Sequence, residues 1–288
     1  MINLIFGCGY LGRRVARQWH DAADEVVVVT RSVEKAGDFE SHGYETVVAD
    51  VTRPKTLRNL PGAGTVLFAV GHDRSTGKSI ADVYVEGVRN ALAALPPAAS
   101  RFIYVSTTGV YGNANGGWVD EETPPDPQRE GGRASLAAEQ TLAAHPLGRR
   151  SIILRLAGIY GPGRVPFIDR LRAAEPIPAR GAGHLNLIHV EDAAAVVVAA
   201  TRLAPFDDGP RIYCVSDGHP VQRSEYYGEV ARQIGAQPPQ FVEPDPNSPR
   251  ARRASADRRV RNDRVLADLH VKLAYPDYRA GLAALLST

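Results

Sequence analysis

The feature that most constrains this chain is a glycine-rich loop directly after its first apolar run. Ile2–Phe6 is followed by GCGYLG at residues 7–12, and a helical pattern begins at once. A short apolar run bounded by glycines predicts a buried parallel strand. Between a strand and a helix, this glycine spacing is typical of dinucleotide binding. Gly7 permits the tight turn, Gly9 lets the backbone approach a pyrophosphate, and Gly12 allows close helix–strand packing.

Strands and helices alternate through the first half of the chain. Apolar runs predict strands over 2–6, 25–30, 46–49, 65–70, 101–106 and 152–156, and helices over 11–19, 80–95 and 134–144. Such alternation implies right-handed crossovers and a parallel sheet. After Tyr160 the pattern loosens, with a strand at 212–216 and helices at 192–203, 222–234, 262–269 and 278–286. We predict an α/β protein, a Rossmann-type doubly wound parallel sheet with a smaller C-terminal substrate lobe.

The domain division expected from this pattern falls at residue 160. Residues 1–160 would form the dinucleotide-binding Rossmann domain, and residues 161–288 would form mainly the substrate-binding lobe. The strand-like and helical segments within 186–218 are a candidate for return to the Rossmann domain.

Two places in the sequence indicate which dinucleotide is bound. The amides of Tyr10 and Leu11 would meet the pyrophosphate at the helix N-terminus. The second predicted strand ends in Thr30-Arg31-Ser32, where an NAD-preferring site would place Asp or Glu for the ribose hydroxyl. Arg31, followed by Ser32, instead suits a 2′-phosphate, because guanidinium presents a planar fork of donors. The sequence therefore favours NADP, with NAD as the alternative cofactor. The alternative role for Arg31 is that of a solvated surface residue that contacts no cofactor.

Composition narrows the class of partner. The 288 residues carry a net charge of +2, which favours a small-molecule substrate over nucleic acid or membrane. The longest apolar stretch, Ala193–Ala200, is too short to span a bilayer, and no signal-peptide pattern precedes Ile2. The two cysteines, Cys8 and Cys214, show neither metal-ligand spacing nor a disulfide framework. We expect a cytoplasmic protein without a metal site, either a monomer or a homodimer.

One segment is strongly basic. Seven arginines fall between residues 250 and 264: Arg250, Arg252, Arg253, Arg258, Arg259, Arg261 and Arg264. Aromatic residues do not interleave them, so a stacking platform for single-stranded nucleic acid is not favoured. A site for a phosphate-bearing small ligand and a solvated segment both stay open.

Six short segments give the chain a likeness to a known family. They are VADVT at 48–52, YVSTTGVYG at 104–112, LRLAGIYGPG at 154–163, LIHVED at 187–192, YCVSDG at 213–218 and YPDYRAGL at 275–282. In this order they resemble the extended short-chain dehydrogenases/reductases of the nucleotide-sugar epimerase/dehydratase type, and more narrowly the atypical branch of that superfamily. The resemblance implies further cofactor contacts from Asp50, Val51, Ala69, Val70, Gly71, Leu156 and Ala157. It assigns His189 and Asp192 to a structural corner, where Asp192 would cap a helix.

The catalytic Tyr-x-x-x-Lys pair of that family is absent. None of the eleven tyrosines has Lys four residues later, and the matching helix positions hold Gly131 and Ser135. The relay needs a phenol whose pKa is lowered by a nearby ammonium, which neither residue supplies. The resemblance places the family's catalytic Ser or Thr at Thr107, and position makes Tyr111 the first choice for the proton. The weaker candidates are Tyr84, Tyr160 and the acidic loop Asp120–Glu122. A ring that only packs is the alternative for each tyrosine, Tyr111 included, and a solvated loop is the alternative for the carboxylates.

Two functions follow from these observations. The first is an NAD(P)-binding, epimerase/dehydratase-like oxidoreductase whose substrate is a nucleotide-sugar or another small anionic metabolite. The second is a catalytically inactive NAD(P)-binding redox sensor or regulatory protein. The glycine loop at 7–12 supports both functions. They differ in whether another group takes over the proton transfer of the missing Tyr-x-x-x-Lys pair.

Overall fold

The computed structural model describes residues 1–245 and 256–286. Three arginines of the basic run, Arg250, Arg252 and Arg253, lie outside the described residues. The chain divides into two compact units, each assembled from three segments. Unit 1 comprises Met1–Thr107, Glu130–Arg155 and Ala194–Tyr213, and unit 2 comprises Thr108–Arg129, Leu156–Ala193 and Cys214–Thr288.

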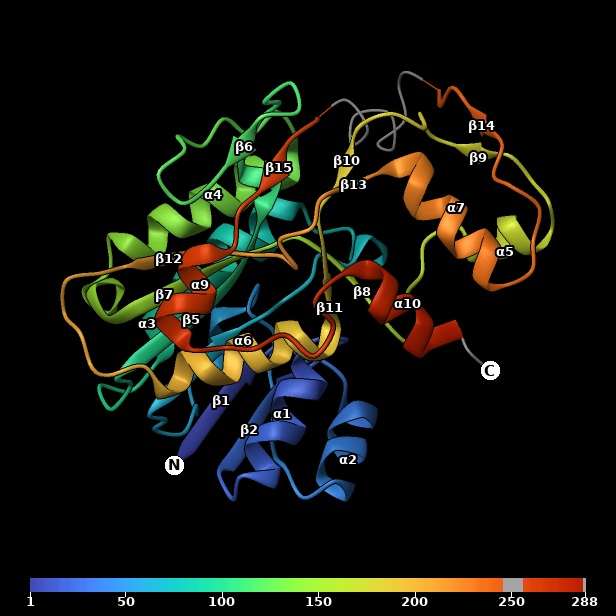
Figure 1. Ribbon diagram of the computed structural model, residues 1–288. Helices are drawn as coiled ribbons and strands as arrows, with labels where there is room; N and C mark the ends of the chain where they lie inside the picture. The colour runs from blue at the N-terminus through green and yellow to red at the C-terminus, as the bar shows by residue number, and fades with distance from the viewer. Residues whose placement is uncertain (246–255, 287–288) are drawn as a thin grey trace. The chain divides into compact units, whose positions relative to one another are not determined.

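Unit 1 is built on a seven-stranded sheet in the order β12-β7-β5-β4-β1-β2-β3 (Figure 1). Its strands are β1 Ile2–Phe6, β2 Glu25–Thr30, β3 Glu45–Val48, β4 Thr65–Phe68, β5 Arg101–Thr107, β7 Ser151–Leu156 and β12 Arg211–Val215. The pairs β1·β2, β1·β4, β2·β3 and β4·β5 are parallel. The predicted Rossmann-type parallel sheet is confirmed. Strand order reverses between β1 and β4, which is where open sheets of this kind bind ligands.

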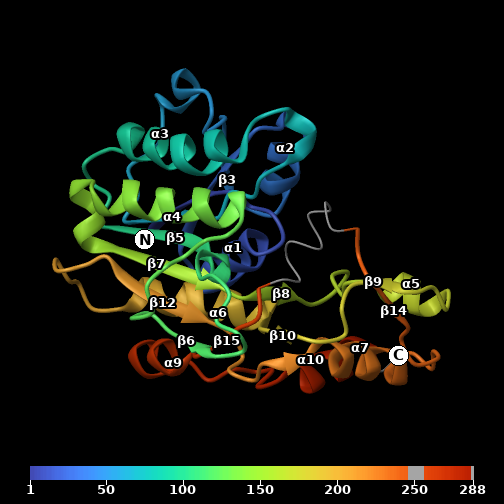
Figure 2. The ribbon, with the colours of Figure 1, turned by 90° about the horizontal axis from the view of Figure 1, so that it is seen from above.

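Helices cover both faces of this sheet. Their bounds are α1 Gly12–Asp21, α2 Val33–Ser41, α3 Gly87–Ala94, α4 Glu130–Ala143 and α6 Val190–Arg202. Figure 2 shows α3 and α4 on one face and α1 and α6 on the other. Because both faces are covered, central strands such as β2 are largely apolar, and the four valines of β2 are all buried.

Two of the longer helical segments of unit 1 differ from the sequence prediction. Helix α2 was not predicted, because only Ala36 and Phe39 of its nine residues are buried and no apolar periodicity results. The helix predicted over 80–95 is not uniform. Its first part, Asp82–Glu86, is a π-helical turn that continues into α3.

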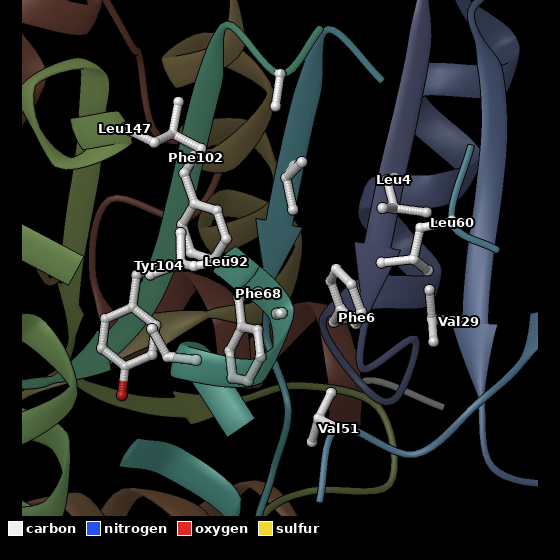
Figure 3. Packing of buried hydrophobic residues seen from close by; sticks show 14 of the residues in the cluster. Leu4, Phe6, Val29, Val51, Leu60, Phe68, Leu92, Phe102, Tyr104 and Leu147 are labelled. Atoms are coloured by element: carbon white, nitrogen blue, oxygen red, sulfur yellow. The ribbon is translucent and has the colours of Figure 1, made fainter. Parts of the chain in front are cut away.

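The core of unit 1 is centred on aromatic rings from neighbouring strands. Phe68 packs against Phe6, Phe102 and Tyr104, with ring centroids 5.8, 6.3 and 6.0 Å apart (Figure 3). Aliphatic side chains such as Leu4 and Leu92 close around them. This packing fixes the carboxyl ends of β1 and β4. The glycine loop follows β1 directly.

Unit 2 contains four helices and short two-stranded pairs in its described residues. The helices are α5 Ile168–Arg172, α7 Arg223–Gln233, α9 Asp263–Leu269 and α10 Tyr278–Leu286. The pairs join β8 Gly158–Tyr160 to β11 Leu187–His189, β9 Ile177–Pro178 to β14 Phe241–Val242, β10 His184–Leu185 to β13 Val221–Gln222, and β6 Trp118–Val119 to β15 Arg259–Val260. A cluster of buried tyrosines forms its core: Tyr160, Tyr226, Tyr227 and Tyr278.

The segment at 275–282 is tied to the corner formed by residues 187–192. The carboxylate of Asp192 accepts hydrogen bonds from the backbone N–H groups of Ala274 (2.7 Å) and Tyr275 (3.0 Å). The rings of Tyr275 and His189 lie 3.8 Å apart. The prediction that Asp192 caps a helix is wrong, because α6 begins at Val190 and the carboxylate binds another segment instead. Two of the resembling motifs therefore hold each other in place.

Candidate functional site

Unit 1 contains a cavity of about 300 Å³ at the carboxyl ends of β1, β2 and β4. Seven of the residues predicted to contact the cofactor line it: Gly7, Gly9, Arg31, Val51, Ala69, Val70 and Gly71. Tyr10, Leu11, Gly12, Ser32 and Asp50 belong to the same unit but do not line this cavity. Leu156 and Ala157 fall in unit 2. The cavity is the size and position expected of a small-molecule pocket at a topological switch point.

The glycine loop has the backbone geometry that a dinucleotide requires. Gly7 has φ +89°, and a Cβ there would lie 2.5 Å from the carbonyl oxygen of Ala69. A Cβ on Gly12 would lie 2.5 Å from the carbonyl oxygen of Gly7, whereas a Cβ on Gly9 would meet nothing within 4 Å. The first and third glycines thus permit close backbone packing, and the second leaves open space. A pyrophosphate fits this cradle beside the N-terminus of α1.

Positive charge lines the cavity beside β2. Arg31 and Lys35 both contribute to the lining, and no carboxylate of the described residues does. Arg31 forms an ion pair with Asp73 at 3.3 Å, with both side chains 48% exposed. Ser32 caps α2 by accepting the backbone N–H of Lys35 at 3.2 Å. The sequence analysis did not name Lys35. Its position shortly after the end of the predicted second strand is the signal that could have indicated a second cation beside the cofactor.

Asp50 and Cys8 are two other polar residues of unit 1. The carboxylate of Asp50 accepts hydrogen bonds from the backbone N–H and the hydroxyl of Thr52. Burial raises the pKa of the Cys8 thiol to about 12, so this cavity-lining residue is a neutral thiol at physiological pH.

The helix positions that would carry the family's Tyr and Lys lead to a buried polar cluster. Ser135 is buried on α4 and its side chain hydrogen-bonds Tyr104. One turn on, Glu139 accepts the Ser106 hydroxyl at 2.5 Å and the Arg155 guanidinium at 2.7 Å. Burial, with the charge of Glu139 adding to it, raises the pKa of Tyr104 above its ordinary value. These groups are satisfied by one another, so the cluster offers no phenol poised near neutral pH.

The two candidate catalytic residues lie in different units. Thr107 is the half-buried last residue of β5 in unit 1, and Tyr111 belongs to unit 2. Tyr111 is 2% exposed, and its hydroxyl lies 3.1 Å from the Cys214 thiol in a hydrogen bond. Glu121, from the acidic loop, accepts the backbone N–H of Cys214 at 2.7 Å. Within unit 2, Tyr111 and Glu121 therefore both form hydrogen bonds with Cys214.

Comparison with known proteins decides the family. The model of the NAD-dependent epimerase/dehydratase family matches residues 4–216. The chain belongs to this family. Membership confirms the resemblance to epimerase/dehydratase-type short-chain dehydrogenases/reductases, and it makes NAD-type nucleotide binding a property of the chain's family.

Among similar proteins, Protein YeeZ of Escherichia coli K12 is 39% identical over 163 residues, which cover 56% of this chain and 56% of YeeZ. The match thus spans little more than half the length of that curated relative. The solved structure of a putative NAD-dependent epimerase/dehydratase from Methylobacillus flagellatus is 32% identical and has a TM-score of 0.81, covering 99% and 97% of the two chains. WbmG of Bordetella bronchiseptica, solved with NAD and UDP, shares the fold, with a TM-score of 0.80 at 18% identity and coverage of 99% and 93%.

Among the helices of residues 1–245 and 256–286, none has the length and apolar character that a membrane span requires. The same part of the chain brings no three His, Cys, Asp or Glu side chains together in a way that could hold a metal ion.

Proposed function

We propose that this protein is an NADP-preferring oxidoreductase of the epimerase/dehydratase type. The dinucleotide would bind in the unit 1 cavity, with its pyrophosphate on the glycine loop and its 2′-phosphate against Arg31 and Lys35. The observation that carries the proposal is a cavity lined by this loop and by two cations, with no carboxylate of the described residues to receive a ribose hydroxyl.

Titration of NADPH and NADH against wild type tests the cofactor preference. A well-formed charge-assisted contact is worth about 1.5–3 kcal/mol, so NADPH should bind about tenfold or more tightly than NADH. Arg31→Ala and Lys35→Ala should each reduce that ratio while leaving NADH binding unchanged. Arg53→Ala, an exposed arginine outside the cavity, is the matched control. Equal affinities in wild type, or ratios unmoved by both substitutions, would contradict the preference.

We further propose that unit 2 binds the substrate, a nucleotide-sugar or another small anionic metabolite. Family membership supports this assignment, and a protein of the same fold has been solved with NAD and UDP. In this proposal Thr107 orients the substrate oxygen and Tyr111 exchanges the proton. The test is cofactor reduction or sugar epimerisation with a panel of UDP-sugars, measured for wild type, Thr107→Ala and Tyr111→Phe. Turnover that survives both substitutions would rule out both roles.

A second function, an NADP-binding sensor without turnover, is favoured by one observation. The helix position of the family's Lys is Ser135, which is buried and bonded to Tyr104, and Gly131 replaces the phenol. General acid–base catalysis typically contributes about 10²–10⁴-fold in rate, so turnover without this pair should be slow. Tight NADPH binding with no turnover across the panel would support the sensor. Turnover at rates ordinary for enzymes, about 1–10³ s⁻¹, would exclude it.

A further inference from the structure

An ion pair in unit 1 joins the segments that follow β2 and β4. Arg31 comes directly after β2 and Asp73 lies in the loop after β4, while β1 lies between these two strands in the sheet. The Nη2 of Arg31 donates to Oδ2 of Asp73 at 3.3 Å, and both side chains are half exposed. Arg31 lines the cavity, whereas Asp73 does not. A carboxylate from beyond the lining residues therefore holds one of the two cations that line the cavity.

The loop after β4 fixes the position of the Asp73 carboxylate. Its Oδ1 accepts the backbone N–H (3.0 Å) and the hydroxyl (2.6 Å) of Ser75, within a 3₁₀ turn over Arg74–Thr76. The hydroxyl of Thr76 donates to the backbone carbonyl oxygen of Asp73 at 2.7 Å. One carboxylate oxygen is thus used inside the loop, and the other accepts from Arg31.

The Asp73 carboxylate is charged at neutral pH. Hydrogen bonds from Ser75, and then the Arg31 guanidinium, lower the pKa of this carboxyl below its ordinary value. A phosphate monoester such as a ribose 2′-phosphate is also an anion, with a charge of about −1.5 to −2 at pH 7. A phosphate bound across the Arg31 fork would lie close to a carboxylate held at Nη2, and like charges repel. The two anions would therefore compete for one guanidinium.

The exposure of the ion pair decides which anion wins. A pair between half-exposed side chains contributes little to stability, because water screens the charges and two long side chains must be ordered. A 2′-phosphate has the higher charge, and it would also lie near Lys35, which lines the same cavity. The phosphate should therefore displace Asp73, and the displacement should reduce its affinity only modestly.

We propose that Asp73 is a specificity-determining residue for the cofactor: it competes with the 2′-phosphate for Arg31 and so weakens the preference for NADP(H) over NAD(H). The inference rests on the proposed function in taking the dinucleotide as the ligand of this cavity. NAD(H) carries a hydroxyl in place of the phosphate and binds while the ion pair persists. NADP(H) binds when Arg31 exchanges one anion for the other.

Fluorescence titration of NADPH and NADH against wild type and Asp73→Asn tests the competition. Asparagine keeps the oxygen that Ser75 needs and removes the charge. NADPH should bind the variant about two- to fivefold more tightly than wild type, which is the value of an exposed ion pair, and NADH should bind both equally. Adenosine 2′,5′-bisphosphate, which has the 2′-phosphate without the nicotinamide, should show the same gain as NADPH.

Asp82→Asn is the matched control. It removes the same charge and a similar contact, because the Asp82 carboxylate accepts the backbone N–H of Ser79 at 3.0 Å, and it should leave both affinities unchanged. The gain on Asp73→Asn should disappear in an Arg31→Ala background, where no guanidinium is left to release. It should persist in a Lys35→Ala background, since Lys35 is not part of the ion pair.

An NADPH affinity that Asp73→Asn leaves unchanged or lowers would overturn the inference, as would a gain that persists without Arg31. Weaker NADH binding by Asp73→Asn would also overturn it, because the carboxylate would then be receiving the ribose hydroxyl. The proposed function fails by other measurements, which are equal affinities of wild type for the two cofactors and the absence of turnover. In that case a gain in NADPH affinity on Asp73→Asn would still support the competition.

Discussion

At the scale of single residues, a glycine of the loop and a glycine of helix α2 differ in their tolerance for a side chain. Gly12 faces the carbonyl oxygen of Gly7, whereas Gly37, inside α2, would place a Cβ in open space. Added atoms at position 12 would meet backbone, which cannot rotate away as a side chain can. The same chemical change should therefore have opposite consequences at these two glycines.

We predict that Gly12→Val abolishes NADPH binding while most of the fold remains, because the helix can no longer approach the turn that we propose receives the pyrophosphate. Gly37→Ala is the control. It should leave binding unchanged and raise the free energy of unfolding by about 0.5–1 kcal/mol, since alanine is the better helix former. Fluorescence titration and urea denaturation measure the two effects. A folded Gly12→Val variant with normal affinity would show that the loop is a turn without a ligand.

The buried pair Glu139–Arg155 leads to a second prediction. Arg155→Met should destabilise the protein by about 3–5 kcal/mol, because it leaves the Glu139 carboxylate buried with only the Ser106 hydroxyl. Adding Glu139→Gln should restore a large part of that loss, because the charge is then removed as well. Urea denaturation of the two single variants and the double variant measures the coupling. Additive losses would mean that the pair does not act as a unit.

Asp217 gives a prediction for pH. It is 3% exposed, its Oδ1 accepts the N–H of His219, and its Oδ2 has no partner among the described residues. Burial raises the pKa of its carboxyl from 3.8 to about 7, with Asp277 adding to the shift and His219 opposing it. The folded state thus holds the proton more tightly than the unfolded chain. Its contribution to stability is greatest below about pH 4 and is lost as pH rises toward 7.

Asp217→Asn removes this titration but keeps an acceptor for His219. The variant should therefore gain on wild type between pH 4 and 7, by up to about 4 kcal/mol at pH 8, from about 1.4 kcal/mol per pKa unit. Urea denaturation at a series of pH values measures the difference. A difference that stays constant with pH would show that the Asp217 carboxyl titrates normally.

At the scale of elements, the sequence identified every strand of the large sheet and missed one of its helices. Continuous apolar runs such as 25–30 are readable because both sheet faces are buried. Helix α2 could not be predicted because it is mostly exposed and lacks an apolar periodicity. The two-residue strands of unit 2 could not be predicted because two residues are too few to show an alternating pattern. For the cavity, glycine spacing and Arg31 were visible in sequence. The Glu139–Arg155–Ser106 cluster was not, because its members are brought together only by the packing of α4 on β5 and β7.

At the scale of the whole molecule, the two units are interleaved along the chain. The polypeptide passes between them after Thr107, Arg129, Arg155, Ala193 and Tyr213. Unit 1 is therefore completed only by Ala194–Tyr213, which supplies most of α6 and the start of the edge strand β12. The guanidinium of Arg101 also binds carbonyl oxygens of this late segment, those of Ala200 (2.9 Å) and Thr201 (2.7 Å).

We predict that a fragment of residues 1–160 does not fold cooperatively, although it contains the entire glycine loop. It lacks α6 and β12, so one edge and part of one face of the sheet would be exposed to water. Thermal denaturation followed by circular dichroism should show no sharp transition, and NADPH should not bind. The full chain is the control. A cooperative, NADPH-binding fragment would mean that the late segment is dispensable.

The interleaving also limits how such a protein can be altered by recombination. Unit 2 occupies three separate stretches, so exchanging it for that of a relative requires five junctions, at 107/108, 129/130, 155/156, 193/194 and 213/214. A single crossover always mixes parental sequences inside at least one unit. Change in specificity by point substitution is then a shorter route than change by exchange of modules, because every intermediate keeps both units from one parent.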